Sequence, residues 1–346
     1  MNDQPKVAII VLNWNGLGDT LECIESVLDQ EYNNFFIIVV DNGSTDDSPA
    51  IIHERYPFIT ILKNENNTGF SLGNNSGMKK AFELGADYVW LLNNDTIVEA
   101  DTLTRLVNTS AGLPDVGMIS PTIYYYDQRD TIQFCGSYID WERKCIIKMD
   151  DFIGFPNGHD VSLWGTALLI KKEIIEKIGF LNEKYFAYHE DEEYSMRVAR
   201  AGYKSMVEPQ AKIYHKNSRS TGSNDAPLQV FLRSRNIFFL WMNNLKRNER
   251  GSYIRNYLAH IISYGGLLKG KNLPDSVSAC LDGMWCAIRG IGGPRNPAIK
   301  TPRTLKLVMN FFISWHPYFW ANLIRGNVSG IYFDMKYTLN SFSALR

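Results

Sequence analysis

Four polar stretches of the chain contain the residues that could do chemistry. Each follows a run of apolar residues or a short strand-like segment, and the central residues are Asp41, Asp95, Asp191 and His215. Carboxylates and imidazoles can bind metal ions or accept a proton. Each stretch alone also fits an ordinary turn or helix cap, so its meaning depends on what the fold brings together.

The stretch "DNGSTDDS" begins with Asp41 directly after the apolar run "FFIIVV". At a strand end, this carboxylate could accept hydrogen bonds from a nucleobase N–H or from ribose hydroxyls. A surface turn leading into a helix capped by Ser48 and Pro49 is the ordinary alternative. The dinucleotide pattern GxGxxG is absent, which argues against a nicotinamide-binding fold.

The stretch "LLNNDT" ends a second apolar run on Asn93, Asn94 and Asp95. One carboxylate together with phosphate oxygens is a common way for a protein to hold Mg²⁺ or Mn²⁺. The alternative is a turn stabilised by the asparagine side chains. Between these runs lies "NNTGFSLGNNSG", whose glycines allow a ligand to approach the backbone and whose helix start suits an anion. No Gly-Lys-Ser/Thr follows, so it is not a phosphate-binding loop of the Walker A type.

Four consecutive acids, Glu190 to Glu193, precede an amphipathic helix. Acids at a helix N-terminus complement the helix dipole, by about 0.3–1 kcal/mol each. Four adjacent carboxylates nevertheless repel one another, so we expect at least one to point into a cleft as a general base. Further on, His215 ends a short strand and precedes Lys216, Arg219, Ser220 and Thr221, a cluster suited to phosphate, although a lone histidine is more often structural.

The elements that must position these residues follow a strand–helix rhythm over the first hundred residues. Continuous apolar runs predict buried strands at 7–12, 35–40, 59–62 and 88–92. Strands that alternate with helices predict a mostly parallel sheet, whose ligands bind beyond the carboxyl ends of the strands. We therefore expect Asn13, Asp41, Asn67 and Asp95 to converge on one edge of the sheet. From about Pro227 the pattern is helical, which predicts a first domain at 1–226 and a helical region at 227–346.

The composition limits the class of protein. The chain has 346 residues, 45% of them hydrophobic, and a net charge of −1, so no global field would attract nucleic acid. Five cysteines without a CxxC pair argue against a disulfide framework or a structural zinc site and fit a reducing cytosol. The N-terminus lacks the features of a signal peptide. The longest apolar stretch, 307–324, is interrupted by polar residues and predicts a core or interfacial helix.

The order of these motifs along the chain is more specific than any one of them. "VAIIVLNWNG", "VVDNGSTDDS", "NNTGFSLGNNSG", "LLNNDT", "WGTALLIKKE", "HEDEEYSMRVARAGY" and "IYHKNSRST" follow one another. The ensemble resembles the family-2 inverting glycosyltransferases with the GT-A fold, most closely their bacterial rhamnosyltransferase-like branch. The resemblance covers about Val7 to Trp241. It implies an α/β fold with a Rossmann-like, mostly parallel central sheet flanked by helices and a C-terminal helical extension.

The resemblance also implies roles for the matched positions. Asp191 would be the catalytic base, and Asp95 and His215 would hold Mg²⁺ or Mn²⁺ against the donor diphosphate. Asn93 stands where the family has the first carboxylate of its DxD motif, which leaves the strength of metal binding open. The nucleotide side would be formed by Asn13, Asn15, Asp41, Gly69, Phe70, Gly73, Asn75, Asn93 and Asn94. The sugar and acceptor side would be formed by Trp164, Gly165 and Glu190.

The expected function is transfer of a sugar, with inversion, from a nucleoside-diphosphate sugar to a glycan or lipid-linked saccharide in bacterial cell-surface polysaccharide synthesis. The expected donor is dTDP-L-rhamnose, with a UDP-hexose as its rival. A non-catalytic nucleotide-sugar-binding protein is the alternative from another class, and a nucleotidyltransferase would want a basic N-terminal loop that "NWNGLGDT" lacks. The expected location is the cytoplasm. The C-terminal aromatic residues could contact the inner face of the plasma membrane, form a homodimer contact or pack in a core.

Overall fold

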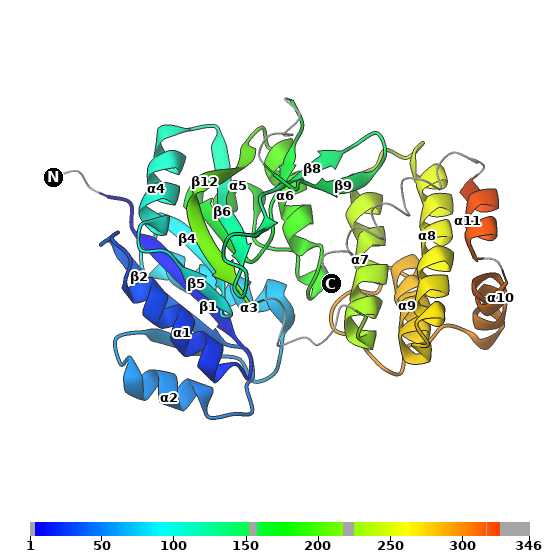
Figure 1. Cartoon of the computed structure of the whole chain (residues 1–346), viewed down its shortest axis with the longest axis horizontal. Coiled ribbons are helices and arrows are strands. Elements are labelled where there is room, and N and C mark those ends of the chain that lie inside the picture. Colours follow the sequence, from blue (N-terminus) through cyan, green and yellow to red (C-terminus); the bar gives the residue numbers. More distant parts are fainter. Residues whose placement is uncertain (1–3, 152–157, 217–224, 316, 326–346) are drawn as a thin grey trace. The chain divides into compact units, whose positions relative to one another are not determined.

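The computed structural model describes residues 4–151, 158–216, 225–315 and 317–325. Contacts between Cα atoms divide the chain into two compact units, Met1–Gly222 and Ser223–Arg346. The first unit contains the sheets and the second is helical (Figure 1). All five cysteines are free thiols, as the sequence predicts.

The described part of the first unit is built on a nine-stranded sheet in the order β3-β2-β1-β4-β11-β6-β12-β5, with β7 paired to β6. The first four strands in this order are parallel and run through the buried core. Their bounds are β1 Val7–Asn13, β2 Phe35–Asp41, β3 Thr60–Lys63 and β4 Tyr88–Asn93. The four strands predicted from the apolar runs are therefore confirmed, each within about a residue of its expected limits.

The remaining strands make the sheet mixed. β11 runs antiparallel to both β4 and β6, whereas β12 runs parallel to β6 and antiparallel to β5. The short strand expected to end at His215 is the last part of a longer strand, β12, whose pairing with β6 has two register shifts. The bounds are β5 Thr96–Val98, β6 Val116–Tyr125, β7 Ile132–Phe134, β11 Ala167–Lys171 and β12 Lys204–His215. The antiparallel β5–β12 pair connects the turn after β4 to the end of β12.

Helices follow the strands and cover the sheet, which confirms the predicted α/β architecture. α3 packs on β1 and β2, α4 on β6 and β12, and α1 on β1 and β5. The contact of α3 is close because Cβ atoms at Gly73 and Gly77 would lie only 2.6 Å from Leu12 and Ile10. The bounds are α1 Leu17–Leu28, α2 Ser48–Arg55, α3 Gly69–Glu83, α4 Thr102–Gly112, α5 Lys172–Ile178, the 3-10 helix η1 Glu183–Tyr185 and α6 Glu190–Arg200.

The chain between β7 and β11 forms a second, small antiparallel sheet with the strand order β10-β8-β9. Its strands are β8 Ser137–Asp140, β9 Cys145–Lys148 and β10 Val161–Ser162. The hairpin β8–β9 agrees with the strand-and-turn pattern of this segment. β10 matters for the site because its end leads directly into Trp164 and Gly165.

The second unit consists of helices in the residues that the structure describes. They are α7 Pro227–Asn244, α8 Arg250–Gly270, α9 Pro274–Ile288, α10 Arg303–Ser314 and α11 Pro317–Arg325. α7 packs on α9, and α8 packs on α9, α10 and α11. Within the described residues, no helix is long and apolar enough to cross a membrane.

Candidate active site

The polar residues at the strand ends of the first unit are joined by hydrogen bonds. Asn13 lies opposite Asp41 in the register of β1 and β2, and its Nδ2 donates to Oδ1 of Asp41 at 3.1 Å. The Oγ1 of Thr20 donates to Oδ1 of Asn13 at 2.8 Å and accepts from Nδ2 of Asn94 at 2.9 Å. The turn after β4 and the end of β2 therefore lie at the same edge of the sheet.

Asn13 itself is wholly buried. Its Nδ2 also reaches the hydroxyls of Ser44 and Ser48, at 3.1 and 2.9 Å. An amide with both hydrogens and its oxygen engaged has little left for a ligand. Asn13 thus orients Asp41 and holds the loop after β2 by hydrogen bonds. A direct contact of Asn13 with a nucleotide stays a prediction.

Two further asparagines hold the loops of this edge together. Asn15, at a φ of 51°, accepts at Oδ1 from the backbone N–H of Thr45 at 2.7 Å. Asn42 donates to Oδ1 of Asn67 at 3.1 Å and accepts from Thr68 Oγ1 at 2.8 Å. Asn67 therefore joins the edge, as expected. No separate signal in the sequence pointed to Asn42, although it directly follows Asp41.

The glycines and Asn75 of α3 serve the protein's own packing. Gly73 lets α3 approach Leu12, and Gly69, at a φ of +83°, lies so close to Phe186 that a Cβ would be 2.4 Å from its carbonyl oxygen. Asn75 is buried, donates to the carbonyl of Leu181 at 2.9 Å and accepts from its N–H at 3.0 Å. The space that these glycines leave is occupied by other parts of the chain, and a contact of Gly69, Gly73 or Asn75 with a nucleotide stays a prediction.

The four consecutive acids have four different surroundings. Glu193 bonds Arg197 at 3.0 Å, and Glu192 contacts Nδ1 of His189. Glu190 is buried, and its Oε2 has no hydrogen-bond partner in the described residues. Burial and the neighbouring carboxylate of Asp191 raise the pKa of Glu190 well above its ordinary value. Only Asp191 combines partial exposure with contacts to a second loop.

Asp191 is held by two backbone donors. Its Oδ2 accepts from the N–H of Gly165 at 2.8 Å and its Oδ1 from the N–H of Glu192 at 2.9 Å. Burial, with a smaller contribution from Glu192, raises the pKa of Asp191 to about 6. A carboxylate oxygen has two acceptor sites, so each oxygen keeps one for a proton. A carboxylate with this pKa is a suitable general base near neutral pH.

The surroundings of Asp191 bring together two residues expected on the sugar and acceptor side and one expected near the nucleotide. A Cβ at Gly165 would lie 2.9 Å from the ring of Phe70 and 3.6 Å from Oδ2 of Asp191, so glycine lets this ring approach the carboxylate closely. Trp164, half-buried, stacks on Phe134 with ring centroids 4.2 Å apart. The loop Trp164–Gly165 thus links the aromatic rings to the carboxylate. Phe70, expected near the nucleotide, lies beside Gly165.

The segment before α6 has an unusual backbone. Phe186, Tyr188 and His189 have φ values of 66°, 69° and 71°, a region that residues other than glycine seldom adopt. The carbonyl of Phe186 accepts from the N–H of Ser71 at 3.2 Å. Backbone strain of this kind costs about 1–3 kcal/mol per residue and is concentrated at functional sites. The bond from Ser71 holds this segment, and with it the start of α6 and Asp191, against the first turn of α3.

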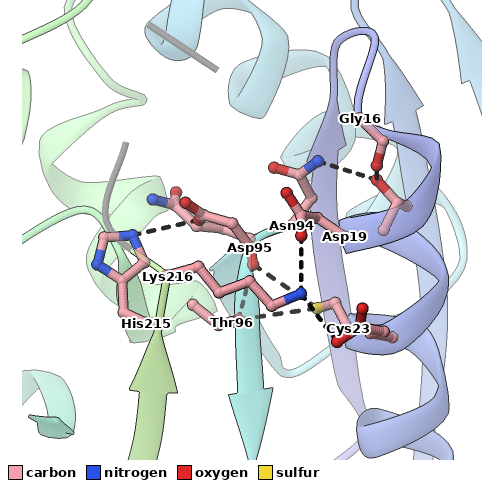
Figure 2. A network of polar contacts seen from close by, with 11 residues as sticks. Gly16, Asp19, Cys23, Asn94, Asp95, Thr96, His215 and Lys216 are labelled. Atoms are coloured by element: carbon pink, nitrogen blue, oxygen red, sulfur yellow. Dashed lines mark hydrogen bonds and ion pairs between the residues drawn. The ribbon is translucent and has the colours of Figure 1, made fainter. Parts of the chain in front are cut away.

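The predicted metal ligands lie side by side at the β5–β12 pair. The Nε2 of His215 is 3.2 Å from Oδ1 of Asp95, and both residues are buried (Figure 2). The Nδ1 of His215 is 2.8 Å from Oε1 of Gln133. In the tautomer with the proton on Nδ1, this nitrogen donates to Oε1 of Gln133, and the lone pair of Nε2 faces Asp95 and is available to a cation.

This donor set fits a divalent cation. Two ligands of an octahedral Mg²⁺, each at about 2.1 Å and at right angles, lie about 3 Å apart. No group of three or more His, Cys, Asp or Glu side chains suited to a metal occurs in the described residues. The pair alone therefore offers two ligands, and oxygens of a bound ligand or water would complete the coordination. Gln133, which sequence reasoning missed, supplies the outer hydrogen bond that metal-binding histidines commonly make.

Lys216 does not serve the expected phosphate cluster. Its Nζ binds Asp19 at 2.7 Å and Glu22 at 2.8 Å, both on α1, and its side chain is almost entirely buried (Figure 2). Its charge is therefore neutralised, and it fastens the end of β12 to α1. Arg219, Ser220 and Thr221, the other members of that cluster, lie outside the described residues.

Comparison with known proteins agrees with this geometry. Residues 8–179 match the family described as Glycosyl transferase family 2. An uncharacterised protein, y4gI, of Sinorhizobium fredii is 28% identical over 246 residues, which span 66% of this chain but only 26% of that protein. An N-acetylglucosaminyl-diphospho-decaprenol L-rhamnosyltransferase of Mycobacterium tuberculosis is 25% identical over 64% of this chain and 82% of its own length. The dTDP-rhamnosyl transferase RfbF of Shigella flexneri is 22% identical over 68% and 79%.

Solved structures share the fold. The mannosyltransferase PcManGT of Pyrobaculum calidifontis, in complex with GDP-Man and Mn²⁺, superposes with a TM-score of 0.52 at 17% identity, covering 94% of this chain and 85% of that one. TarS of S. aureus superposes with a TM-score of 0.56 at 16% identity, covering 93% and 55%. The expected GT-A fold is thereby confirmed.

Proposed function

Because this chain belongs, through residues 8–179, to glycosyl transferase family 2, we propose that it is an inverting, metal-dependent sugar transferase. The donor is a nucleoside-diphosphate sugar and the acceptor is a hydroxyl of a saccharide. The observation that carries this proposal is the state of Asp191: a partly exposed carboxylate, oriented by two backbone N–H groups, with a pKa raised to about 6.

Asp191 performs the proton transfer. The acceptor hydroxyl approaches the anomeric carbon on the side opposite the diphosphate, and the carboxylate takes its proton as the new C–O bond forms. The bond from the anomeric carbon to the diphosphate oxygen breaks, and its electron pair leaves with the nucleoside diphosphate. One direct displacement inverts the configuration at the anomeric carbon. Gly165 supports the reaction because its N–H keeps one oxygen of Asp191 fixed while the other receives the proton.

Asp95 and His215 hold the diphosphate end. Their facing Oδ1 and Nε2 atoms would bind Mg²⁺ or Mn²⁺, and such an ion neutralises the charge that develops on a departing diphosphate. Asp41 is fixed by Asn13 at the same edge and would accept hydrogen bonds from the base or the ribose. Asn93, without a carboxylate, adds no charge to this site, so the affinity for the ion depends on Asp95, His215 and the donor.

The donor we propose is dTDP-L-rhamnose and the acceptor a lipid-linked saccharide of cell-surface polysaccharide synthesis. The names of the relatives from Mycobacterium and Shigella support the sugar, and the first of them names a diphospho-lipid acceptor. Work on such an acceptor would take place at the cytoplasmic face of the membrane. This chain is only 25% and 22% identical to these two relatives, and at such identities the donor can differ, so a UDP-hexose is the alternative donor.

A panel of nucleotide sugars, scored by thermal shift with and without Mn²⁺, tests the donor, because a ligand that binds only the folded state raises the melting temperature. We expect dTDP-rhamnose to give the largest shift and Mn²⁺ to increase it. Equal shifts with UDP-glucose or UDP-galactose would overturn rhamnose as the donor. Tight donor binding without transfer to any saccharide acceptor, in a protein that hydrolyses no donor, would favour the non-catalytic alternative.

A further inference from the structure

Helix α10 in the second unit has apolar side chains on two opposite faces. One face is packed: Met309 and Ile313 are buried, and Cβ atoms at Gly265 of α8 and Gly266 would meet Ile313 and Pro317 at 2.6 and 2.5 Å. These glycines allow α8 to receive α10 closely. The packing of α10 on its own unit is therefore complete without its second apolar face.

The second face is exposed. Leu307, Phe311 and Trp315, spaced four residues apart and so on one ridge of the helix, are 71%, 53% and 57% exposed. With Asn310 and Ser314 they line a shallow groove. Further exposed apolar residues of this region are Val308, Tyr318 and Leu323. We call Leu307, Phe311 and Trp315 the α10 ridge.

The charged residues in the sequence around the α10 ridge have one sign. The sequence contains no Asp or Glu between Asp282 and Asp334, whereas it contains six basic residues there, namely Arg289, Arg295, Lys300, Arg303, Lys306 and Arg325. Lys300 and Arg303 are exposed. Arg303 lies one turn before Leu307 on the same ridge, so a cation adjoins the exposed apolar side chains.

We propose that the α10 ridge docks on the surface of an anionic lipid bilayer, with the helix lying in the plane of the interface. An exposed aliphatic and aromatic ridge bordered by cations matches the boundary between acyl chains and negatively charged headgroups. Tryptophan and tyrosine favour this depth. The helix is too short to span the bilayer, so it binds from one side only.

The charge also distinguishes the bilayer from a second copy of the chain. A symmetric dimer would set the same surface patch against itself, and Lys300 and Arg303 of one copy would face the cations of the other. An anionic bilayer instead offers opposite charge together with apolar depth. The proposal concerns the second unit alone and holds whatever sugar or acceptor the first unit uses, although it suits an acceptor that is anchored in the membrane.

Co-sedimentation of the full chain with vesicles tests the proposal. We expect binding to vesicles of phosphatidylcholine mixed with phosphatidylglycerol, weaker binding to pure phosphatidylcholine, and a decrease in binding as salt rises. The double variant Leu307→Asp and Phe311→Asp should lose binding at least tenfold. The variant Lys300→Gln and Arg303→Gln should lose the preference for anionic vesicles. Phe58→Asp, which changes an equally exposed side chain (69%) in the first unit, is the matched control and should bind like the wild type.

Three outcomes would overturn the proposal. The wild type could fail to bind anionic vesicles, or the Leu307→Asp and Phe311→Asp variant could bind as well as the Phe58→Asp control. The wild type could also sediment as a dimer that this variant converts to a monomer, with no binding to lipid, which would assign the α10 ridge to a second copy. Circular dichroism of each variant verifies that the fold is intact. Donor binding by the same variants separates this test from the sugar-transfer proposal, because the α10 ridge variants should keep the donor-induced thermal shift.

Discussion

The Nε2 of His215 lies 3.2 Å from Oδ1 of Asp95 because β12 runs antiparallel to β5 and sets His215 opposite Thr96. A backbone hydrogen bond lies next to this contact: the N–H of Lys216 donates to the carbonyl of Asp95 at 3.0 Å. Two residues far apart in the sequence thus form one two-ligand site. Gln133, from β7, fixes the orientation of the imidazole in that site.

The first prediction concerns the base. Asp191→Asn removes the proton acceptor but keeps the size of the side chain, so transfer should fall by a factor of about 10²–10⁴, the usual contribution of general base catalysis. Donor binding should persist, measured as the thermal shift with the donor. Glu192→Gln, next to it in α6, is the matched control and should keep most of the activity. Unchanged transfer by Asp191→Asn would refute the base assignment.

The pH dependence follows from the raised pKa of Asp191. The base acts in its deprotonated form, so kcat/KM should be constant above a pKa of about 6 and fall about tenfold per pH unit below it. An aspartate of ordinary pKa would keep full activity at pH 5. The measurement is kcat/KM from pH 4.5 to 8, in steps of about half a pH unit, with donor binding measured at the same pH values. A flat profile down to pH 5 would contradict the raised pKa.

The third prediction concerns Gln133. Gln133→Leu removes the acceptor that keeps the proton on Nδ1 of His215, so the affinity for Mn²⁺ should fall about 10–100-fold, as for other outer partners of metal-binding histidines. Calorimetric titration of Mn²⁺ in the presence of a nucleoside diphosphate measures it. Gln133→Glu restores an acceptor oxygen and should recover most of the affinity. His215→Ala should lose more affinity than Gln133→Leu, and the reverse order would contradict the assigned roles.

The fourth prediction concerns the packing of α3. Gly73→Ala would bring a Cβ to 2.6 Å from Cδ1 of Leu12, so the Leu12 side chain or α3 must shift, at a cost of about 1–3 kcal/mol in the free energy of unfolding. Gly18→Ala, in the first turn of α1 with no atom within 4 Å of the new methyl, is the matched control. It should stabilise the protein by up to about 1 kcal/mol, because alanine favours a helix more than glycine does. Urea unfolding of both variants measures the difference.

The fifth prediction separates two roles of Lys216. If it anchors β12 to α1, Lys216→Met should lower the free energy of unfolding by about 1 kcal/mol, a modest value because Asp19 and Glu22 are partly exposed. The KM for the donor should stay within about twofold, which corresponds to less than about 0.5 kcal/mol, because the charge of Lys216 is used by Asp19 and Glu22. A large rise in KM with unchanged stability would instead restore Lys216 to the phosphate cluster. Thermal melts and donor titrations on the same preparation decide between the two.

The parallel half of the sheet and its polar edge could be predicted from the amino-acid pattern alone. Continuous apolar runs can form strands buried on both faces only with cover above and below, so β1, β2 and β4 and the polar residues that end them followed from pattern alone. The acids before α6 and the glycines of α3 were also visible. What these residues touch was not, since a glycine that admits a ligand and a glycine that admits Leu12 look the same in a sequence.

Which polar residues have their donors and acceptors occupied by the chain itself became visible only in the folded protein. Asn13, Asn75 and Lys216 were equally polar in the sequence, but folding buries each among partners that occupy its donors and acceptors. Asp191 differs from its three acidic neighbours because the N–H of Gly165 donates to its carboxylate. Asp95 and His215 became a pair through the antiparallel β5–β12 contact, a long-range pairing that no local spacing encodes.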